Sequence, residues 1–293
     1  MGDAFSTETK QVTADLARRR TGPLDLVVYS MAAPRRRHPD TAELHRSVLK
    51  PIGAAFEGNT FDLNTRTVRR VALEPATSQQ ILETISVMGG DDWSRWIRFL
   101  AERELLAEHA TTVAFSYVGP EMLRPTYRDG TIGRAKEDLE ATAVRLSDAY
   151  PAIGLQARVA VMQAMITQSS AAIPMSGLYT LVLTKVLREQ GVYETVLDQC
   201  YRLLAEHLYA DQAPHLDSAG RIRLDDLELR PDILAEVKRR LAAIDDTNLA
   251  ELGDPAEFER EILRLYGFEN PTVDYGADTD PVRPIPSGPV TVV

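Results

Sequence analysis

The chain has almost no cysteine and no long hydrophobic run. Cys200 is the only cysteine among 293 residues, so no disulfide can form within the chain, and a reducing cytoplasm suits it best. We expect Cys200 to be a buried small residue on a helix. Charges interrupt every apolar stretch before it reaches the roughly 20 residues of a membrane-spanning helix. Because the N-terminus also lacks the basic start and apolar stretch of a signal peptide, these absences predict a cytoplasmic protein without a membrane span.

An excess of positive charge is also missing. The formal net charge is −10, which argues against long-range attraction to nucleic acid or to an anionic membrane. The five histidines show no metal-ligand spacing and one cysteine cannot make a zinc motif, so no metal site is predicted. Three arginine clusters are expected to be solvated surface. They lie at residues 18–20, 35–37 and 69–70.

Three apolar runs, at residues 24–31, 111–118 and 159–166, predict buried strands. They are rich in β-branched and aromatic residues and nearly continuous in hydrophobicity, which is typical of a parallel sheet covered on both faces. Helical patterns separate them, and one of these opens with a predicted capping box of Thr77 and Gln80. Strands that alternate with helices predict a doubly wound, Rossmann-like α/β fold.

The character of the chain changes after residue 174, where the patterns become mostly helical. Residues 270–293 carry five prolines and little periodicity, which is typical of an irregular extension. We therefore predict one catalytic domain over residues 1–254, with additional helices, and a C-terminal extension over residues 255–293.

A glycine-rich phosphate-binding turn is absent as well. Dinucleotide-binding folds usually have G-x-G-x-x-G after the first strand, because only glycine lets the backbone approach the pyrophosphate. None of the seventeen glycines forms this motif or a P-loop. Gly130-x-x-Gly133 lies in a different context, directly before a predicted helix.

Residues 114–138 are the segment with the most candidate catalytic side chains. They span the end of the second predicted strand, a loop and the start of a predicted helix. Ligands of open parallel sheets sit outside the carboxyl ends of the strands. The stretch contains Tyr127 and Lys136. A nearby ammonium would lower the phenol pKa from about 10 and make the tyrosine a better general acid. The spacing alone leaves an ordinary structural role for the pair equally open.

The residues around this pair resemble the family of trans-2-enoyl-CoA reductases and the related FabV-type enoyl-acyl-carrier-protein reductases, large members of the short-chain dehydrogenase superfamily. The similarity runs in order along the chain. It includes residues 2–6 (GDAFS), 25–34 (DLVVYSMAAP), 49–53 (LKPIG), 74–77 (EPAT), 87–93 (VMGGDDW), 116–119 (SYVG), 167–174 (TQSSAAIP), 223–230 (RLDDLELR) and 265–275.

The resemblance implies NADH-dependent reduction of the trans-2 double bond of enoyl thioesters in fatty acid synthesis. Tyr127 corresponds to the catalytic tyrosine, Lys136 to the lysine that holds the cofactor ribose, and Tyr117 to the tyrosine at the substrate thioester. The implied cofactor-binding residues are Asp3, Ala4, Met31, Ala32, Lys136, Met165, Ile166 and Thr167.

In the implied mechanism, hydride reaches the β-carbon and negative charge develops on the thioester oxygen. Tyr127, with Tyr117 as a possible helper, would bind that oxygen and supply a proton, while Lys136 lowers the Tyr127 pKa. The arginines at residues 35–37 are a second candidate contact, for a phosphate of coenzyme A or carrier protein. Arg124 stands where the family commonly has an aromatic residue, which puts the substrate preference in doubt.

Family members begin with roughly a hundred further residues, the size of a βαβαβ cofactor-binding half. This chain resembles them from the end of the third strand onward. Two interpretations stay open: an enzyme whose recorded start is late, or a shortened non-catalytic relative that binds acyl thioesters or a partner protein. The expected partner is an acyl-CoA or an acyl-carrier-protein thioester, and the family implies a monomer. Residues 266–280 show no flavin-binding chemistry, so FAD is not expected.

Overall fold

The structure is a computed structural model that describes residues 2–63, 65–167, 176–280 and 282. Its strands are β1 (Leu24–Tyr29), β2 (Arg35–Arg37), β3 (Leu44–Arg46), β4 (Phe56–Asp62), β5 (Thr67–Leu73), β6 (Leu106–Ser116), β7 (Gln156–Val161) and β8 (Arg221–Arg223). Its longer helices are α1 (Thr7–Arg20), α2 (Ser78–Met88), α3 (Asp91–Ala101), α4 (Thr131–Ala149), α6 (Ser176–Glu189), α8 (Pro231–Ala243) and α10 (Pro255–Leu265). The shorter helical segments are η1 (Glu121–Leu123), η2 (Pro151–Ile153), α7 (Val196–Arg202), the π-helix η3 (Leu203–Leu208) and α9 (Leu249–Leu252).

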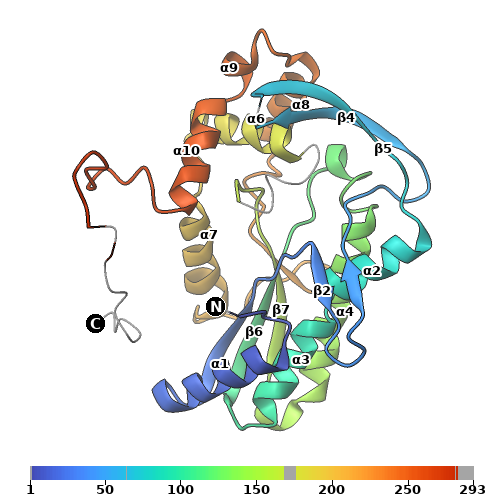
Figure 1. The fold of residues 1–293 in the computed structure, drawn as a ribbon, viewed down its shortest axis with the longest axis vertical. Helices are drawn as coiled ribbons and strands as arrows, with labels where there is room; N and C mark the ends of the chain where they lie inside the picture. Colours follow the sequence, from blue (N-terminus) through green and yellow to red (C-terminus); the bar gives the residue numbers. More distant parts are fainter. Residues whose placement is uncertain (1, 64, 168–175, 281, 283–293) are drawn as a thin grey trace.

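A parallel sheet of four strands forms the lower half of the molecule (Figure 1). The strand order is β1-β6-β7-β8, and each neighbouring pair runs parallel. All four strands therefore end at the same edge, where open α/β sheets bind their ligands. Strand β1 is the outer strand of the described sheet, and the side chain of Val28 within it is 47% exposed. The α/β fold predicted from the sequence is confirmed.

Helices cover both faces of this sheet. On one face, α1, α3 and α4 contribute buried residues such as Ala14, Trp93 and Leu139. The indole of Trp93 donates a hydrogen bond to Thr112 Oγ1 over 2.8 Å, which satisfies two polar groups inside this layer. On the other face, Leu203 of η3 packs with Val113 and Ala160 of the strands. Burial on both faces explains why the strand sequences are nearly continuously apolar.

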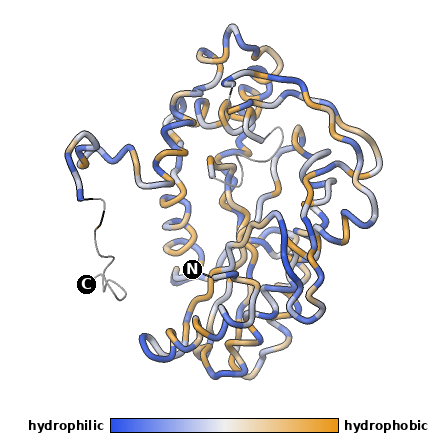
Figure 2. The backbone as a smooth tube through the Cα atoms, viewed as in Figure 1, coloured by the Kyte–Doolittle hydropathy of each residue, from blue (hydrophilic) through white to orange (hydrophobic). Residues whose placement is uncertain are grey.

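A second, mostly helical layer lies beyond the carboxyl ends of the strands (Figure 1). It combines the antiparallel hairpin of β4 and β5 with α6, α8, α9 and α10. Its core contains Phe61 of the hairpin, Leu181 of α6, Val237 of α8 and Phe258 of α10. Figure 2 shows the apolar segments concentrated in the central strands and in α6, with polar segments outside. The two layers meet where the strands end.

Two helices begin with a capping box, in which a side chain and a backbone amide exchange hydrogen bonds. Thr77 accepts from the backbone of Gln80, and the Gln80 side chain accepts from the backbone of Thr77, as the sequence predicts. Thr195 and Asp198 form the same arrangement at α7, which the sequence analysis did not single out. Each box satisfies backbone amides that a helix leaves without an internal partner.

Three sequence expectations need correction. The third predicted strand, at residues 159–166, already ends at Val161, because the chain leaves the sheet there to border a pocket. The hairpin of β4 and β5 was not predicted, since its strands alternate between exposed and half-buried positions with no continuous apolar run. Cys200 is only partly buried.

The arginines at residues 35–37 form strand β2 and not a solvated loop. Arg36 is 1% exposed, and its guanidinium bonds to Asp91 Oδ2 at 2.6 Å and to the carbonyl oxygen of Ser86 at 2.7 Å. It also lies over the ring of Phe5. The expectation of a solvated cluster was therefore wrong for Arg36, because a buried guanidinium needs this many partners.

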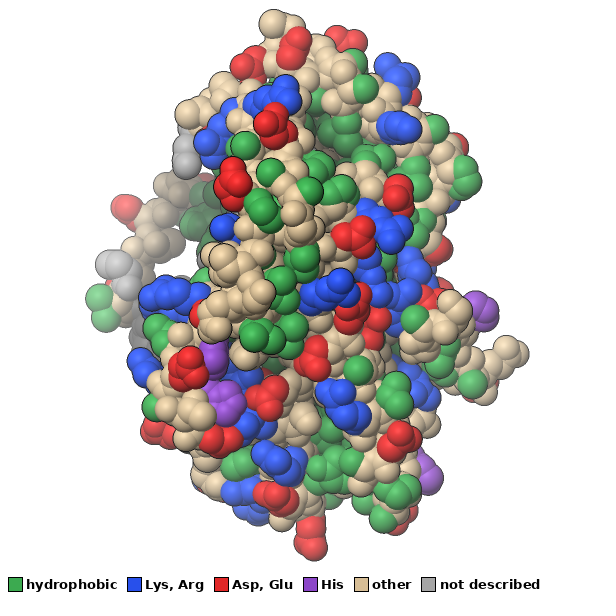
Figure 3. All heavy atoms as spheres, turned by 90° about the vertical axis from the view of Figure 1, so that its right-hand side faces the viewer, with side chains coloured by type: hydrophobic (Ala, Val, Ile, Leu, Met, Phe, Trp, Pro, Cys, Tyr) green, Lys and Arg blue, Asp and Glu red, His purple; other side chains and the backbone are tan. Residues whose placement is uncertain are grey.

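Irregular chain follows α10 up to the last described residue, and Figure 1 draws it away from the body. The boundary at residues 254 and 255 stays a prediction. In the described part of the chain, no helix is long and apolar enough to cross a membrane, and no three metal-binding side chains gather. Acidic and basic side chains are interspersed over the face that Figure 3 presents.

Gly133, in the first turn of α4, is expected to tolerate no side chain. A Cβ at this position would overlap the backbone carbonyl oxygen of Arg128, which a side-chain rotation cannot relieve. We expect Gly133→Ala to lower the free energy of unfolding by about 2 kcal/mol, as overpacking does. Urea unfolding of the purified protein measures this change.

Gly177, in the first turn of α6, is the matched control. Among the described residues, a Cβ there meets no atom nearer than the Phe61 carbonyl oxygen at 3.8 Å. Because alanine is a better helix former than glycine, Gly177→Ala should be neutral or stabilise by up to about 1 kcal/mol. Equal stabilities of the two variants would show that the contact at Gly133 is not the constraint.

Candidate active site

The carboxyl ends of β1, β6 and β7 border a pocket of about 700 Å³. Residues 30–34 follow β1, residues 115–117 close β6, and residues 162–165 follow β7. Helices α4 and α6 contribute further residues to the wall. This is the place where the parallel topology predicts a ligand, and the volume lies in the range of small-molecule sites.

Tyr127 and Lys136 both line this pocket. Lys136 lies in the second turn of α4, and its Nζ donates to the carbonyl oxygen of Phe115 at 3.2 Å. Tyr127 lies in the loop before α4, and its ring meets that of Tyr117 edge to face at a centroid distance of 4.9 Å. The structure thus places in one pocket the three residues that the sequence analysis assigned to proton donation, cofactor binding and substrate contact.

The beginning of α4 holds the loop that carries Tyr127. The backbone N–H groups of Gly130 and Gly133 both donate to the Tyr127 carbonyl oxygen at 3.1 Å. The Thr131 hydroxyl donates to the carbonyl oxygen of Val48 at 2.5 Å and accepts from the backbone of Lys50 at 3.3 Å. These bonds satisfy amides of the first helical turn. They also fix where Tyr127 stands relative to the helix that carries Lys136.

Burial shifts the pKa values of Tyr127 and Lys136 in the directions that favour the neutral form of each group. It raises the pKa of Tyr127 well above 10, with the carboxylate of Glu228 adding to the rise. It lowers the pKa of Lys136 to about 8, against the attraction of Glu140. The expectation that Lys136 lowers the Tyr127 pKa is therefore wrong for this structure. Loss of hydration outweighs the ammonium, which is bonded to the Phe115 carbonyl.

The remaining predicted residues divide into two groups. Met31, Ala32, Met165 and Thr167 line the pocket with the tyrosines and Lys136. Ile166 is 6% exposed and packs in the hydrophobic core, so its side chain does not line the pocket. The family-like segment at residues 168–174 lies outside the described residues.

Asp3 and Ala4 lie outside the pocket lining, in the turn before α1. The carbonyl oxygen of Ala4 accepts from Lys10 Nζ at 3.1 Å and from the Trp96 indole at 3.2 Å. The Lys10 ammonium is buried and forms an ion pair with Asp92 at 2.8 Å. A buried ion pair of this kind requires several hydrogen bonds, and here they hold the turn in place.

Arg124, which departs from the family pattern, forms an ion pair on the surface. Arg124 Nε donates to Asp129 Oδ2 at 2.9 Å, and both side chains are about half exposed. Arg134 pairs with Glu137 on the exposed side of α4. Because none of the four lines the pocket, their substitution leaves the described pocket wall unchanged.

The sequence analysis missed Glu228, a fully buried carboxylate behind the pocket wall. Its Oε1 accepts from the hydroxyls of Tyr117 at 2.6 Å and Tyr179 at 2.7 Å. Its Oε2 accepts from the backbone of Ala164 at 2.6 Å. Burial raises the pKa of Glu228 to about 7, although these three bonds oppose the rise. The signal in the sequence was its place in the family-like segment at residues 223–230, which by itself assigned Glu228 no role.

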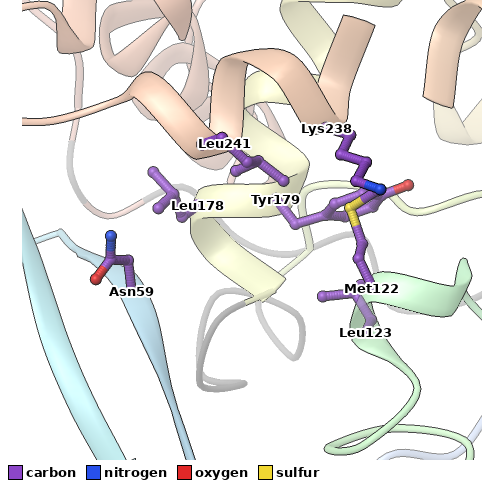
Figure 4. Close-up of a pocket in the computed structure, with 8 residues that line it drawn as sticks. Asn59, Met122, Leu123, Leu178, Tyr179, Lys238 and Leu241 are labelled. Atoms are coloured by element: carbon purple, nitrogen blue, oxygen red, sulfur yellow. The ribbon is translucent and has the colours of Figure 1, made fainter. Parts of the chain in front are cut away.

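A second, smaller cavity of about 250 Å³ adjoins the first, and Leu123 and Tyr179 line both. In Figure 4, Met122 and Lys238 extend toward each other at the Tyr179 ring, and Asn59 faces in from β4. The walls come from the hairpin, η1, α6 and α8.

Comparison with known proteins identifies two matching family models. The trans-2-enoyl-CoA reductase catalytic region matches residues 1–209, and the enoyl reductase FAD binding domain matches residues 216–279. From residues 216–279, Lys238, Leu241 and Ala242 line the smaller cavity, and no residue lines the larger pocket. A cavity of about 250 Å³ is below the usual size for even a drug-sized ligand. The smaller cavity therefore does not fit a flavin, and no chemical step is assigned to one.

Similar proteins cover nearly the whole chain. The enoyl-acyl-carrier-protein reductase (NADH) of Opitutus terrae is 45% identical over 97% of this chain and 72% of its own length. The trans-2-enoyl-CoA reductase (NADH) of Ruminiclostridium cellulolyticum is 45% identical over 95% of this chain and 70% of its own.

Among solved structures, the trans-2-enoyl-CoA reductase of Treponema denticola in complex with NAD matches with a TM-score of 0.89 and 41% identity. The match covers 95% of this chain and 69% of that one. A match of this extent in both sequence and structure is specific to a family as well as to a fold. The chain belongs to the family of trans-2-enoyl-CoA reductases, which includes enoyl-acyl-carrier-protein reductases that use NADH.

Proposed function

We propose that the chain carries out NADH-dependent reduction of the trans-2 double bond of enoyl thioesters in fatty acid synthesis. One observation carries this proposal. In a chain about 45% identical to NADH-dependent enoyl reductases, Tyr127, Lys136 and Tyr117 line one pocket at the carboxyl ends of three parallel strands. The alternative of a non-catalytic acyl-binding relative is not favoured, because the proton-donating wall of the pocket is intact.

The residues around the pocket fit the nicotinamide end of the cofactor. Among the described residues, the Ser116 hydroxyl and both amide atoms of Gln163 are buried without a hydrogen-bond partner. Both residues line the pocket beside Met165. Buried polar groups of this kind need a partner, and the ribose hydroxyls and carboxamide of NADH offer several.

We assign the holding of NADH to residues on three sides of the pocket. Met31 and Ala32 lie after β1, Met165, Ile166 and Thr167 lie after β7, and Lys136 lies on α4. Asp3 and Ala4 are assigned to the adenine end on the resemblance to the family, and their turn lies outside the pocket lining. Lys136, as an ammonium, donates to the ribose.

The proposed reaction combines a hydride with a proton. NADH, when bound, supplies the hydride that adds to the β-carbon of the enoyl thioester. The electrons of the double bond move toward the thioester oxygen, where negative charge develops. Tyr127 donates a hydrogen bond to that oxygen and supplies a proton, which ends on the α-carbon as the carbonyl re-forms and the saturated thioester is completed. Its raised pKa keeps the phenol protonated, as a donor requires.

The proposal is tested with the purified chain, NADH and crotonyl-CoA, by following the loss of NADH absorbance. The same assay with a crotonyl carrier protein compares the two thioester carriers. Folded protein that neither binds NADH nor consumes it with either carrier would refute the proposal for this chain.

Replacing Tyr127 with phenylalanine is expected to lower kcat by about 10²- to 10⁴-fold, because the variant loses the proton donor. The dissociation constant for NADH should stay within about twofold of the wild type, since the hydroxyl is assigned to the thioester and not to the cofactor. Steady-state kinetics and NADH fluorescence titration measure the two quantities. The matched control is Tyr150→Phe, at the far end of α4 and away from the pocket.

Replacing Lys136 with methionine is expected to stabilise the fold while weakening NADH binding. The pKa of Lys136 falls from 10.5 to about 8 on folding. Below pH 8 the lysine is therefore a buried ammonium, which lowers the free energy of unfolding. We expect Lys136→Met to raise the free energy of unfolding by about 2 kcal/mol at pH 7. The gain should shrink as the pH rises from 8 toward 10.5, where the unfolded chain also loses the proton.

Urea unfolding at pH 7 and pH 10 measures this difference, and fluorescence titration measures NADH affinity. Lys185→Met is the matched control, because Lys185 also donates to a main-chain carbonyl, that of Ala250 at 3.1 Å, but near the surface. A stability gain equal in both variants, or independent of pH, would contradict the account of Lys136.

A further inference from the structure

Glu228 lies in the segment between β8 and α8, directly behind the pocket wall. It is 0% exposed and does not line the pocket. Its hydrogen-bond partners Tyr117, Tyr179 and Ala164 all line the pocket. One carboxyl group thus joins the end of β6, the chain after β7 and helix α6. Such a group affects a ligand only through the residues it holds.

The hydrogen bonds around Glu228 determine where a proton can sit on its carboxyl group. Oε2 accepts from the backbone N–H of Ala164 at 2.6 Å, and that N–H cannot accept a proton in return. On Oε1 a proton faces two hydroxyl oxygens that can accept it, so we place any proton on Glu228 there. That atom lies 2.6 Å from the Tyr117 hydroxyl and 2.7 Å from the Tyr179 hydroxyl.

The direction of the bond between Glu228 and Tyr117 depends on this proton. A phenol has one hydrogen and can also accept. When Glu228 is ionised, Tyr117 donates its hydrogen to Oε1 and offers a bound ligand only a lone pair. When Oε1 carries a proton, that proton can be donated to Tyr117, and the Tyr117 hydrogen is free for the pocket. An acceptor in the pocket selects this arrangement over donation to Tyr179.

Tyr117 stands beside the proposed proton donor, with its ring edge to face on Tyr127. A thioester oxygen that Tyr127 reaches therefore lies near Tyr117 as well. We propose that Glu228 is a positioning residue whose protonation state decides whether Tyr117 presents a hydrogen-bond donor or an acceptor to the thioester oxygen. The inference rests on the proposed function and adds to it a residue that touches neither substrate nor cofactor.

The change of direction falls in the neutral range. Burial raises the pKa of Glu228 to about 7, with a further contribution from Asp225, so the carboxyl group titrates between roughly pH 6 and 8. The titratable groups around it are Tyr117 from β6, Tyr179 from α6, Tyr127 from the loop before α4, and Asp225 and Asp226 from its own segment. Asp225 is paired with Arg223 at 2.6 Å. Lys136, also in the pocket wall, has a pKa of about 8 and titrates in every variant below.

Glu228→Gln copies the protonated acid at every pH. The amide oxygen can replace Oε2 and accept from Ala164, while the amide NH₂ replaces Oε1 and donates to both tyrosine hydroxyls. The backbone of Ala164 and both tyrosine hydroxyls each keep a hydrogen-bond partner at residue 228, so we expect the variant to fold. Tyr117 is then a donor to the pocket regardless of pH.

The experiment compares kcat for crotonyl-CoA reduction by wild type and Glu228→Gln between pH 6 and 8.5. The ratio of the variant to the wild type should rise about tenfold over this range, because only the wild type loses a hydrogen bond to the charged oxygen. The shared titration of Lys136 cancels in this ratio. A ratio constant within twofold would overturn the proposal.

Two further variants keep the test decisive. Glu121→Gln removes a carboxylate that is 85% exposed and should keep the wild-type pH profile. Tyr117→Phe removes the hydroxyl that Glu228 controls, so kcat at pH 6 should fall about tenfold toward the alkaline level of the wild type. If Glu228→Gln does not fold, a Tyr117→Phe profile with the wild-type change near pH 7 overturns the proposal.

A measurement without turnover separates this inference from the proposed function. The infrared band of a protonated carboxyl group should disappear from the wild type between pH 6 and 8.5. Tyr117→Phe should keep a titrating band, and Glu228→Gln should lack it. A chain that does not reduce crotonyl-CoA but shows these bands refutes the proposed function and leaves the Glu228 geometry intact. A band unchanged by Glu228→Gln refutes the inference alone.

Discussion

The contact between the first turn of α4 and the Tyr127 loop is the constraint on which the site depends. The carbonyl oxygen of Tyr127 accepts hydrogen bonds from the backbone N–H groups of Gly130 and Gly133. The absence of a side chain at Gly133 lets the loop and the helix approach this closely. Lys136 lies in the second turn of the same helix and lines the pocket. The spacing of the pair along the sequence is therefore set by a helix start packed on a loop.

The pocket has two buried ionisable groups whose pKa values move in opposite directions for one reason. Water is excluded, so Lys136 releases its proton more easily and Glu228 holds its proton more tightly. Both shifts lower the stability of the folded protein near neutral pH. Outside the pocket, burial also lowers the pKa of Lys10, although Lys10 forms an ion pair with Asp92.

Patterns that depend on local periodicity could be read from the sequence. The runs that form β6 and β7 are buried on both faces and hence nearly continuous in hydrophobicity, and β1 at the edge of the described sheet is partly buried. The capping box at Thr77 requires only two residue types three positions apart. The approach of Tyr127 to Lys136 was also expected, but resemblance to a family carried that expectation, since the spacing alone was not decisive.

Features that depend on contacts across the chain could not be read in this way. Arg36 looks like one of three equivalent surface arginines, and only the folded chain brings the Asp91 carboxylate and the Ser86 carbonyl to it. Glu228 lies 111 residues from Tyr117 and 64 from Ala164, so no local pattern relates them. The end of β7 at Val161 was missed because the apolar residues beyond it serve the pocket wall, and periodicity does not distinguish that use from a strand.

The direction of the pKa shifts at Tyr127 and Lys136 bears on what the pocket stabilises. With no ligand charge nearby, burial favours the neutral phenol and lowers the affinity of Lys136 for its proton. A negative charge that develops in the pocket has the opposite effect on Lys136, since an anion favours the ammonium. It also strengthens hydrogen bonds from the tyrosine hydroxyls. The wall therefore interacts more strongly with an enolate-like oxygen than with a neutral thioester, which is the difference that accelerates a reaction.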